Sequence, residues 1–470
     1  MNLKRFFVVR LLTLSMLVLT ITSGVLAQQQ PTGFVRTEKV DGVWWLISPE
    51  GEKFISLGVN HIEPHLWLAP YNKAKNLERY GSDFILPDGR FNPGGTAARK
   101  WIDNLRVICE DLHFNTFAKH THPSIPATLY QDHIYYVASL ETAPIGRWRQ
   151  ERGEGPRPDV FSQDFEHHLA QTVKAACMQH RNNRNLLGYL YADVPYWETY
   201  PSMRKTVSEK AMIYPWVNAL LSLGEESEGK WKWIEILQKR YPSAEAAAEV
   251  WGMPISPAYG VSWDYLARLQ TWFEPVDVER AQQDMELFMG MIAEQWYRLH
   301  HDYIRRYDPN HLILGDKSNI GSFRDWLVPT LKNYVDVVMI QSYATSKRDA
   351  EKAEWLYREI GKPIINGDGC FGFADPERQQ LGIKGFRTGA KSTQEVAAMY
   401  QKYLQEIMAT PYMIGWHHCG FMEQWDEAER GDVSTNENGF LDPFENYYTE
   451  WTDVIKTSNK AAIEWHLKAK

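Results

Sequence analysis

The sequence predicts an α/β protein built on a (β/α)8 TIM barrel, with a small N-terminal β extension and a helical insertion after the fourth strand. Eight short apolar runs typical of buried strands recur along the chain, and amphipathic helical stretches separate most of them. No glycine-rich phosphate loop follows the first run, which argues against an open dinucleotide-binding sheet. At 470 residues the chain is long enough for a barrel that carries insertions.

The chain begins with a targeting pattern. Residues 1–27 have a basic start, an apolar stretch and small residues before Gln28, as a secretory signal peptide does. Residues 28–53 enter the hairpin-like stretch VDGVWWLISPEGEKF and form the expected β extension. We therefore expect an exported protein, periplasmic or extracellular, whose mature chain has no membrane segment.

The barrel itself is expected over residues 54–470. Its eight strands are FISLGVN (54–60), NTFAKHT (115–121), IYYVASLE (134–141), LLGYLYAD (186–193), HLILGDK (311–317), VDVVMIQSY (335–343), KPIINGDG (362–369) and YMIGWHHCG (412–420). Residues 200–290 are too long for one crossover helix and predict a helical insertion over one side of the barrel mouth. Residues 447–470 are typical of a closing helix.

Composition limits the kinds of partner. A net charge of -8 without a basic stripe argues against binding of nucleic acid. The 19 Trp and 24 Tyr residues offer flat apolar faces with a polar tip, which suit sugar rings, although most will fill the core. The four cysteines match no metal or disulfide spacing, and we expect buried thiols, with Cys370 and Cys419 both following strand ends.

Polar side chains stand where all eight expected strands end. In barrels of this kind the active site lies at the carboxyl ends of the strands. A pure scaffold does not need this polarity, so we predict a functional site at the mouth. The candidates at or just beyond the strand ends are Asn60, His61, Lys119, His120, Glu141, Asp193, Asp316, Tyr343, Asp368, Trp416, His417 and Glu423.

Three stretches carry a resemblance to a known family. They are VDGVWWLISPEGEKFISLGVN (40–60), LQKRYPSAEAAAEVWG (237–252) and PYMIGWHHCGFMEQW (411–425). Through them the chain resembles the clan A glycoside hydrolases, and most closely the β-agarases of glycoside hydrolase family 50. The second stretch is also similar to a helix of the family 42 β-galactosidases.

The resemblance implies two catalytic glutamates, which this chain does not have. The family places an acid/base Glu after strand four and a nucleophile Glu after strand seven, helped by a Tyr and a Trp. Here Asp193 matches the Asn that precedes the first Glu, and Val194 matches that Glu unless the register slips by one residue. Asp368 stands at the second place, while Tyr343 and Trp416 match the helpers. We expect Asp193 and Asp368 to be the catalytic pair.

Two aspartates in place of glutamates leave several mechanisms open. Each carboxyl is retracted by one methylene, which widens the gap toward the inverting range, whereas a shifted backbone would restore the retaining distance. We expect Asp193 to donate the proton, with its pKa raised by burial beside Tyr191 and Trp197. Three glutamates are the alternatives for that role: Glu141, Glu198 and Glu423.

The function expected from the sequence is a secreted glycoside hydrolase acting on a β-linked galactan such as agarose, porphyran or carrageenan. The alternative is a carbohydrate-binding barrel that has lost hydrolysis. Asp193 and Asp368 within about 10 Å of each other would favour the enzyme, and a buried salt bridge at either would favour the binding protein.

Residues after the second strand suit the polar groups of a sugar. Lys119, His120 and His122 fit its hydroxyls, or a sulfate or carboxylate on it. Metal ligation by His120 and His122 is weighed but not adopted, so neither a metal nor a cofactor is expected. The sequence assigns no oligomeric state.

Overall fold

A computed structural model describes residues 29–146, 157–195, 197, 215–256, 258, 260–343, 347–372, 390–424 and 439–469. The expected signal peptide and Glu198 lie outside these residues. Within them, no helix combines the length and the apolar character that crossing a membrane requires.

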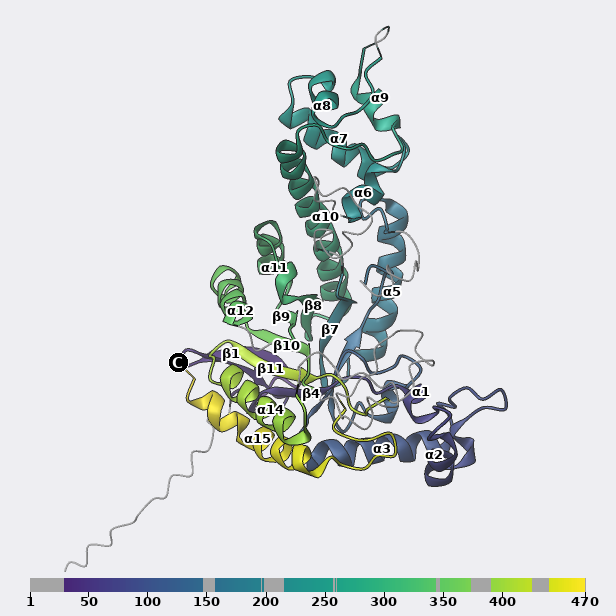
Figure 1. The fold of residues 1–470 in the computed structure, drawn as a ribbon, viewed down its shortest axis with the longest axis vertical. Coiled ribbons are helices and arrows are strands. Elements are labelled where there is room, and N and C mark those ends of the chain that lie inside the picture. Colours follow the sequence, from purple (N-terminus) through teal and green to yellow (C-terminus); the bar gives the residue numbers. More distant parts are fainter. Residues whose placement is uncertain are drawn as a thin grey trace, which may run out of the picture.

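Eight parallel strands close into a barrel, which confirms the predicted fold class (Figure 1). Neighbours around the barrel follow the order of the chain, with the last strand pairing with the first. Each predicted strand overlaps one of these, and β8 runs two residues beyond its predicted end: β4 (Ser56–Val59), β5 (Thr116–Phe117), β6 (Tyr135–Ser139), β7 (Leu186–Asp193), β8 (Leu312–Asn319), β9 (Val338–Gln341), β10 (Ile364–Gly369) and β11 (Met413–His418).

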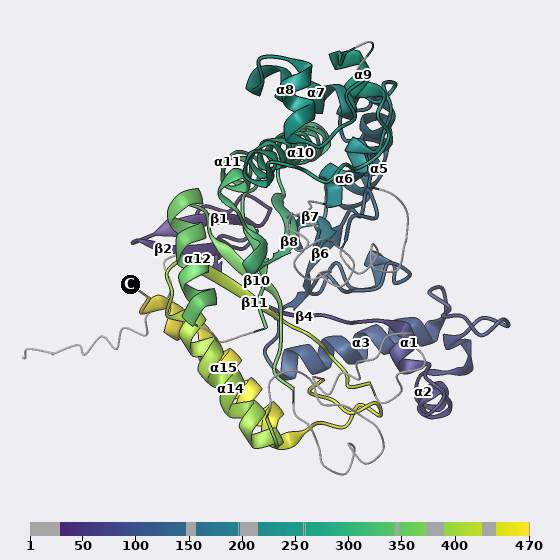
Figure 2. The ribbon, with the colours of Figure 1, turned by 45° about the horizontal axis from the view of Figure 1, so that its top comes forward.

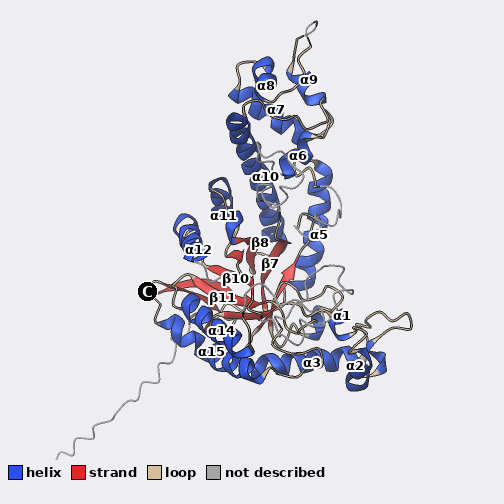
Figure 3. Cartoon of the chain, viewed as in Figure 1, coloured by secondary structure: helices blue, strands red, loops and turns tan. Residues whose placement is uncertain are grey.

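Helices surround the barrel and extend from it, and strands occupy the centre (Figure 3). The α-helices are α1 (Pro64–Trp67), α2 (Lys73–Tyr80), α3 (Thr96–Asp111), α5 (Gln163–His180), α6 (Pro215–Leu221), α7 (Glu228–Arg240), α8 (Ala244–Val250), α9 (Trp263–Arg268), α10 (Val278–Tyr307), α11 (Val328–Tyr334), α12 (Lys347–Ile360), α14 (Thr393–Met408) and α15 (Thr449–Leu467). Short 3-10 turns are η1 (Ser82–Phe84), η2 (Ala127–Leu129), η4 (Ile320–Ser322) and η5 (Asp325–Leu327). The expected closing helix is α15, which lies beside α14 (Figure 2).

The N-terminal extension is a three-stranded antiparallel sheet of β1 (Arg36–Val40), β2 (Val43–Ile47) and β3 (Lys53–Phe54). Its apolar face joins the barrel interior, because Leu46 and Phe54 belong to one buried cluster with residues of the barrel strands. The backbone of Trp44 also donates a hydrogen bond to the carbonyl of Pro411, just before β11. The sheet therefore covers the amino-terminal end of the strands, which leaves the carboxyl-terminal end for a site.

The insertion after β7 forms an arm along α10. This helix has 30 residues and is about 45 Å long, well beyond the eight-residue strand β8 that follows it. Helices α7, α8 and α9 lie at the far end of α10 (Figures 1 and 2). Near the strand ends, Trp216 of α6 stacks on Trp197 with ring centroids 4.9 Å apart, and His300 of α10 hydrogen-bonds to Thr142. That the arm forms a wall of the mouth stays a prediction.

Close strand pairing in the barrel depends on glycines. A Cβ added at Gly188 of β7 would lie 2.5 Å from the carbonyl oxygen of Leu312 on β8, and one at Gly415 of β11 would lie 2.6 Å from that of Ser56 on β4. These partners are backbone atoms in register with the glycines, so no side-chain movement relieves the clash.

We expect Gly188→Ala to lower the free energy of unfolding by about 1–3 kcal/mol, since the strands must move apart. Chemical denaturation measures this loss. Gly321→Ala is the matched control, because a Cβ there meets nothing within 4 Å and the free energy should change by less than about 0.5 kcal/mol. Equal effects of the two substitutions would contradict this account of the strand contacts.

Candidate active site

A buried lysine joins the two aspartates at the barrel mouth. The ammonium of Lys317 lies 2.9 Å from Oδ1 of Asp193 and forms an ion pair with Oδ2 of Asp368. Nε2 of His120 lies 3.5 Å from Oδ2 of Asp193 and 3.4 Å from Oδ2 of Asp368. These two oxygens are therefore at most 6.9 Å apart, the sum of the two distances to Nε2. We call these four residues the Lys317 cluster.

Strand geometry places the Lys317 cluster. Asp193 ends β7 and is in register with Lys317 on β8, so the two side chains leave adjacent strands at the same height. Asp368 leaves β10, and His120 follows β5. The exposed fractions of the side chains are 0% for Lys317, 4% for Asp368 and 16% for Asp193. The charges are thus held at the inner edge of the mouth.

Both aspartates are ionised at neutral pH. Burial alone favours the neutral carboxyl, but Lys317, His120 and Lys119 outweigh it and lower the pKa of Asp193 to about 2. Lys317 and His120 likewise hold the pKa of Asp368 well below its usual range against burial. The expected rise in the pKa of Asp193 is therefore wrong for this structure, because sequence reasoning did not place the lysine beside it.

The glycines beside Asp368 are explained by packing. A Cβ at Gly367 would lie 2.4 Å from Cε of Met339, and one at Gly369 would lie 2.4 Å from the carbonyl oxygen of Ser342. A side chain at position 369 would therefore push β10 away from its neighbour, whereas one at position 367 would require the Met339 side chain to move. Among the described residues, Oδ1 of Asp368 is buried and accepts no hydrogen bond, which leaves it available to a ligand.

Other candidates also lie around the mouth. Lys119 forms an ion pair with Glu141, with Nζ and Oε1 2.8 Å apart. The hydroxyl of Tyr343 lies 3.5 Å from Sγ of Cys419. All four cysteines are buried thiols outside any disulfide, as expected, and Cys370 forms a side-chain hydrogen bond with Cys419.

Several other predicted site residues are buried and make contacts within the protein. The carboxylate of Asp316 accepts a hydrogen bond from Nε1 of Trp197 at 2.9 Å, and burial raises its pKa to about 7. Asn60 donates to the carbonyl of Gly367 and accepts from the backbone of His120, so it braces three strand ends. The other three are fully or almost fully buried: Trp416 packs against Tyr400 and Tyr403, His417 contacts Ser56 by hydrogen bond, and Glu423 accepts from Tyr448.

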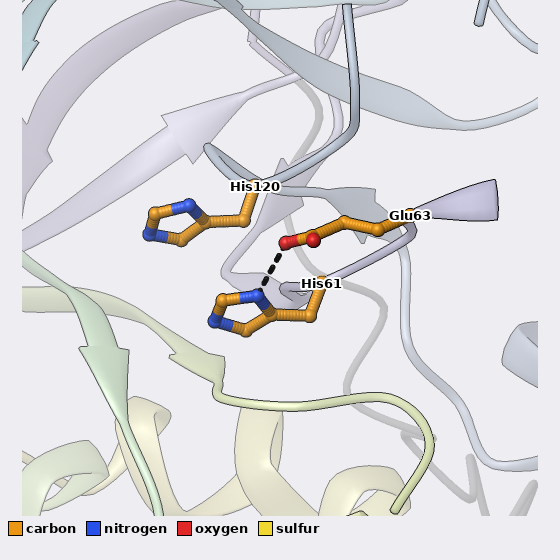
Figure 4. A group of neighbouring side chains, drawn as sticks. All are labelled: His61, Glu63 and His120. Carbon is orange, nitrogen blue, oxygen red and sulfur yellow. Dashed lines mark hydrogen bonds and ion pairs between the residues drawn. The ribbon is translucent and has the colours of Figure 1, made fainter. Parts of the chain in front are cut away.

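A second group at the mouth combines two imidazoles and a carboxylate (Figure 4). Nδ1 of His61 lies 2.6 Å from Oε1 of Glu63, and the rings of His61 and His120 stack with centroids 4.5 Å apart. One potential ligand atom from each of the three residues lies within 4.8 Å of the others. His122, weighed from the sequence as a partner of His120, instead hydrogen-bonds to Ser124.

Sequence reasoning missed Lys317 and Glu63 as site residues. Lys317 directly follows Asp316, and consecutive strand residues point to opposite faces, so only one of them can face inward. Glu63 lies two residues after His61, close enough in sequence to have been considered with it. The alternation of side chains along β8 indicates that Asp316 and Lys317 face opposite sides, but it does not indicate which of the two faces the interior.

Comparison with known proteins gives the nearest functional information. The chain is 23% identical over 491 residues to "Beta-agarase B" of Vibrio sp. (strain JT0107), covering 91% of this chain and 48% of that protein. It is 23% identical over 478 residues to "Beta-agarase A" of the same strain, covering 91% and 46%. The chain is similar to β-agarases. It spans about half the length of these two relatives, and no family model matches it.

Solved structures agree on the fold. The agarase AgWH50C superposes with a TM-score of 0.71 at 19% identity, covering 93% of this chain and 66% of that one. An exo-β-agarase superposes with a TM-score of 0.72 at 18% identity, covering 94% and 67%. At these identities the likeness shows a shared barrel fold.

We predict that Lys317→Met lowers the free energy of unfolding by about 3–5 kcal/mol at pH 7, because two buried carboxylates lose their cation. The ion pairs stabilise the fold above the unfolded aspartate pKa, and this stability is lost as pH falls through the lowered folded values. The difference between wild type and variant should therefore shrink below about pH 4. Denaturant titrations at several pH values measure it.

The double variant Lys317→Met with Asp368→Asn is the control for charge. Removing one carboxylate relieves the repulsion, so this variant should be more stable at pH 7 than Lys317→Met alone. A loss of stability that is independent of pH and unaffected by the second substitution would mean that only packing was changed.

Proposed function

We propose that this protein is a glycoside hydrolase that cleaves β-linked galactan chains of the red-algal type, such as agarose, porphyran or carrageenan. The proposal is supported by sequence similarity to two β-agarases over 91% of the chain. It is also supported by the barrel fold, whose carboxyl-terminal end carries active sites throughout this architecture.

The observation that carries the proposal is the convergence of Asp193 and Asp368 on one edge of the mouth. Glycosidic cleavage generally uses two carboxyl groups, about 5–5.5 Å apart in retaining enzymes and about 6.5–9.5 Å apart in inverting ones. The two Oδ2 atoms are at most 6.9 Å apart, and Oδ1 of Asp193 is closer than that to Oδ2 of Asp368 because both oxygens contact Nζ of Lys317. These upper bounds lie near the retaining separation. The pair thus satisfies the distance that favours an enzyme.

We assign Asp368 to the anomeric side of the bond. It is ionised, and its buried Oδ1 accepts no hydrogen bond among the described residues, as suits a nucleophile or a base that holds water. Asp193 is more exposed, which suits the side of the leaving group. Because Asp193 is ionised beside Lys317, it must gain a proton when substrate disturbs that ion pair.

Glu141 is the other candidate for the proton donor. Glu141 lies at the mouth and forms an ion pair with Lys119, which is the residue before His120 of the Lys317 cluster. Glu423 is fully buried and accepts a hydrogen bond from Tyr448, so we prefer Glu141 to it for this role. Glu198 lies outside the described residues.

The ion pair of both aspartates with Lys317 is also what the non-hydrolytic alternative led us to expect. Similarity to agarases is the reason to prefer hydrolysis. Export to the periplasm or the medium, inferred from residues 1–27, belongs to the same proposal because long galactans are outside the cell.

We expect wild-type protein to release new reducing ends from at least one red-algal galactan oligosaccharide, seen as a fresh anomeric signal in proton NMR. Asp368→Asn should abolish this signal, whereas Asp103→Asn, at an exposed helix position, should not. The α or β form of the first product distinguishes inversion from retention. Binding of an oligosaccharide by wild type without cleavage would overturn the proposal.

A substrate with a good leaving group distinguishes the two candidate acids. In an aryl glycoside of the cleaved oligosaccharide the phenolate leaves without protonation. Loss of the acid should therefore lower kcat/KM little on the aryl glycoside and strongly on the natural substrate. We expect this selective loss, about 100-fold or more on the natural substrate, for Asp193→Asn and not for Glu141→Gln. The reverse pattern would assign the acid to Glu141, and kcat/KM on both substrates is the measurement.

A further inference from the structure

The group formed by His61, Glu63 and His120 has the composition of a transition-metal site. Two imidazole nitrogens with one carboxylate oxygen are the ligand set of many mononuclear zinc sites that keep a position open for water or substrate. The residues come from the ends of two adjacent barrel strands, β4 and β5, which fix their backbones. Figure 4 shows the carboxylate of Glu63 turned toward both rings.

We propose that His61, Glu63 and His120 bind one divalent transition-metal ion, with Zn²⁺ as the expected ion. In the structure Glu63 already contacts Nδ1 of His61 at 2.6 Å, so an ion would take the place of the shared proton. Ligand atoms of one zinc ion lie about 3.3 Å apart, and the three here lie within 4.8 Å. The rings are stacked, with 5° between their planes, and must tilt about Cβ–Cγ to converge.

The surroundings of His120 favour this arrangement. Within the described residues, the polar contacts of its ring use Nε2, which lies 3.1 Å from Nζ of Lys317 and 3.4–3.5 Å from the carboxylates of Asp193 and Asp368. A metal at Nδ1 requires the tautomer with Nε2–H directed at the carboxylates, so in the metal-bound protein Lys317 directs its protons to Asp193 and Asp368 and not to Nε2. A carboxylate on the far nitrogen of a metal-bound histidine is the usual way in which proteins orient such ligands.

The charges are also complementary. A divalent ion with the carboxylate of Glu63 retains one net positive charge. Lys317 forms ion pairs with both neighbouring aspartates, so these three groups together carry one net negative charge. The ion is therefore placed beside a group that offsets its charge. His65 adds a further nitrogen, because its Nε2 lies 3.3 Å from Oε2 of Glu63.

The proposed metal site shares His120 with the Lys317 cluster, but its test does not depend on the proposed hydrolysis, because metal binding is measured without substrate. We expect the full-length protein, stripped with a chelator, to bind one equivalent of Zn²⁺ in calorimetric titration. His61→Ala and His120→Ala should each weaken binding by about 100-fold or more, and His133→Ala, an exposed histidine outside the group, should not. Mg²⁺ should not compete, since nitrogen ligands select against it.

A Co²⁺ titration identifies the ligands by a second readout. The visible absorption of bound Co²⁺ should appear in wild type and change in Glu63→Gln, while thermal melts show that each variant is folded. Absence of stoichiometric Zn²⁺ binding by wild type would overturn the proposal. Binding that survives both His61→Ala and His120→Ala would also overturn it, and would locate the ion at other groups such as Cys370 and Cys419.

Discussion

The barrel mouth depends on the ion pairs that Lys317 forms with Asp193 and Asp368. Two carboxylates this deeply buried repel one another and would not both stay ionised without a cation between them. Because Lys317 is itself fully buried, it in turn needs both partners. The three charges therefore hold the ends of β7, β8 and β10 in one arrangement, and His120 extends it to β5.

This constraint changes how the aspartate pair must work. A glycosidase needs one protonated and one ionised carboxyl group, whereas the lysine keeps both ionised. In the proposed mechanism, substrate must therefore disturb the ion pair at Asp193, or a neighbouring acid must supply the proton. The proposed metal site lies beside this pair and shares His120 with the Lys317 cluster.

The sequence predicted the fold well because barrel strands are buried on both faces and appear as apolar runs, as in LLGYLYAD and YMIGWHHCG. It also predicted that Asp193 and Asp368 would meet, since the carboxyl ends of parallel strands share one edge. It did not identify Lys317, because consecutive strand residues point to opposite faces and the pattern does not say which of them faces inward. Asp316 faces outward to Trp197, and Lys317 faces inward to Asp193. Burial of Glu423 against Tyr448 depends on contacts with the start of α15, which no local pattern reveals.

The most direct test of this account is the titration of the two aspartates themselves. Carbon NMR of protein labelled at the Asp carboxyl groups, assigned with Asp193→Asn and Asp368→Asn, follows each group with pH. The account predicts that neither carboxyl gains a proton above about pH 4 while Lys317 is present. A carboxyl at either position that titrates near neutral pH would contradict it, because such a group would not be held by the lysine.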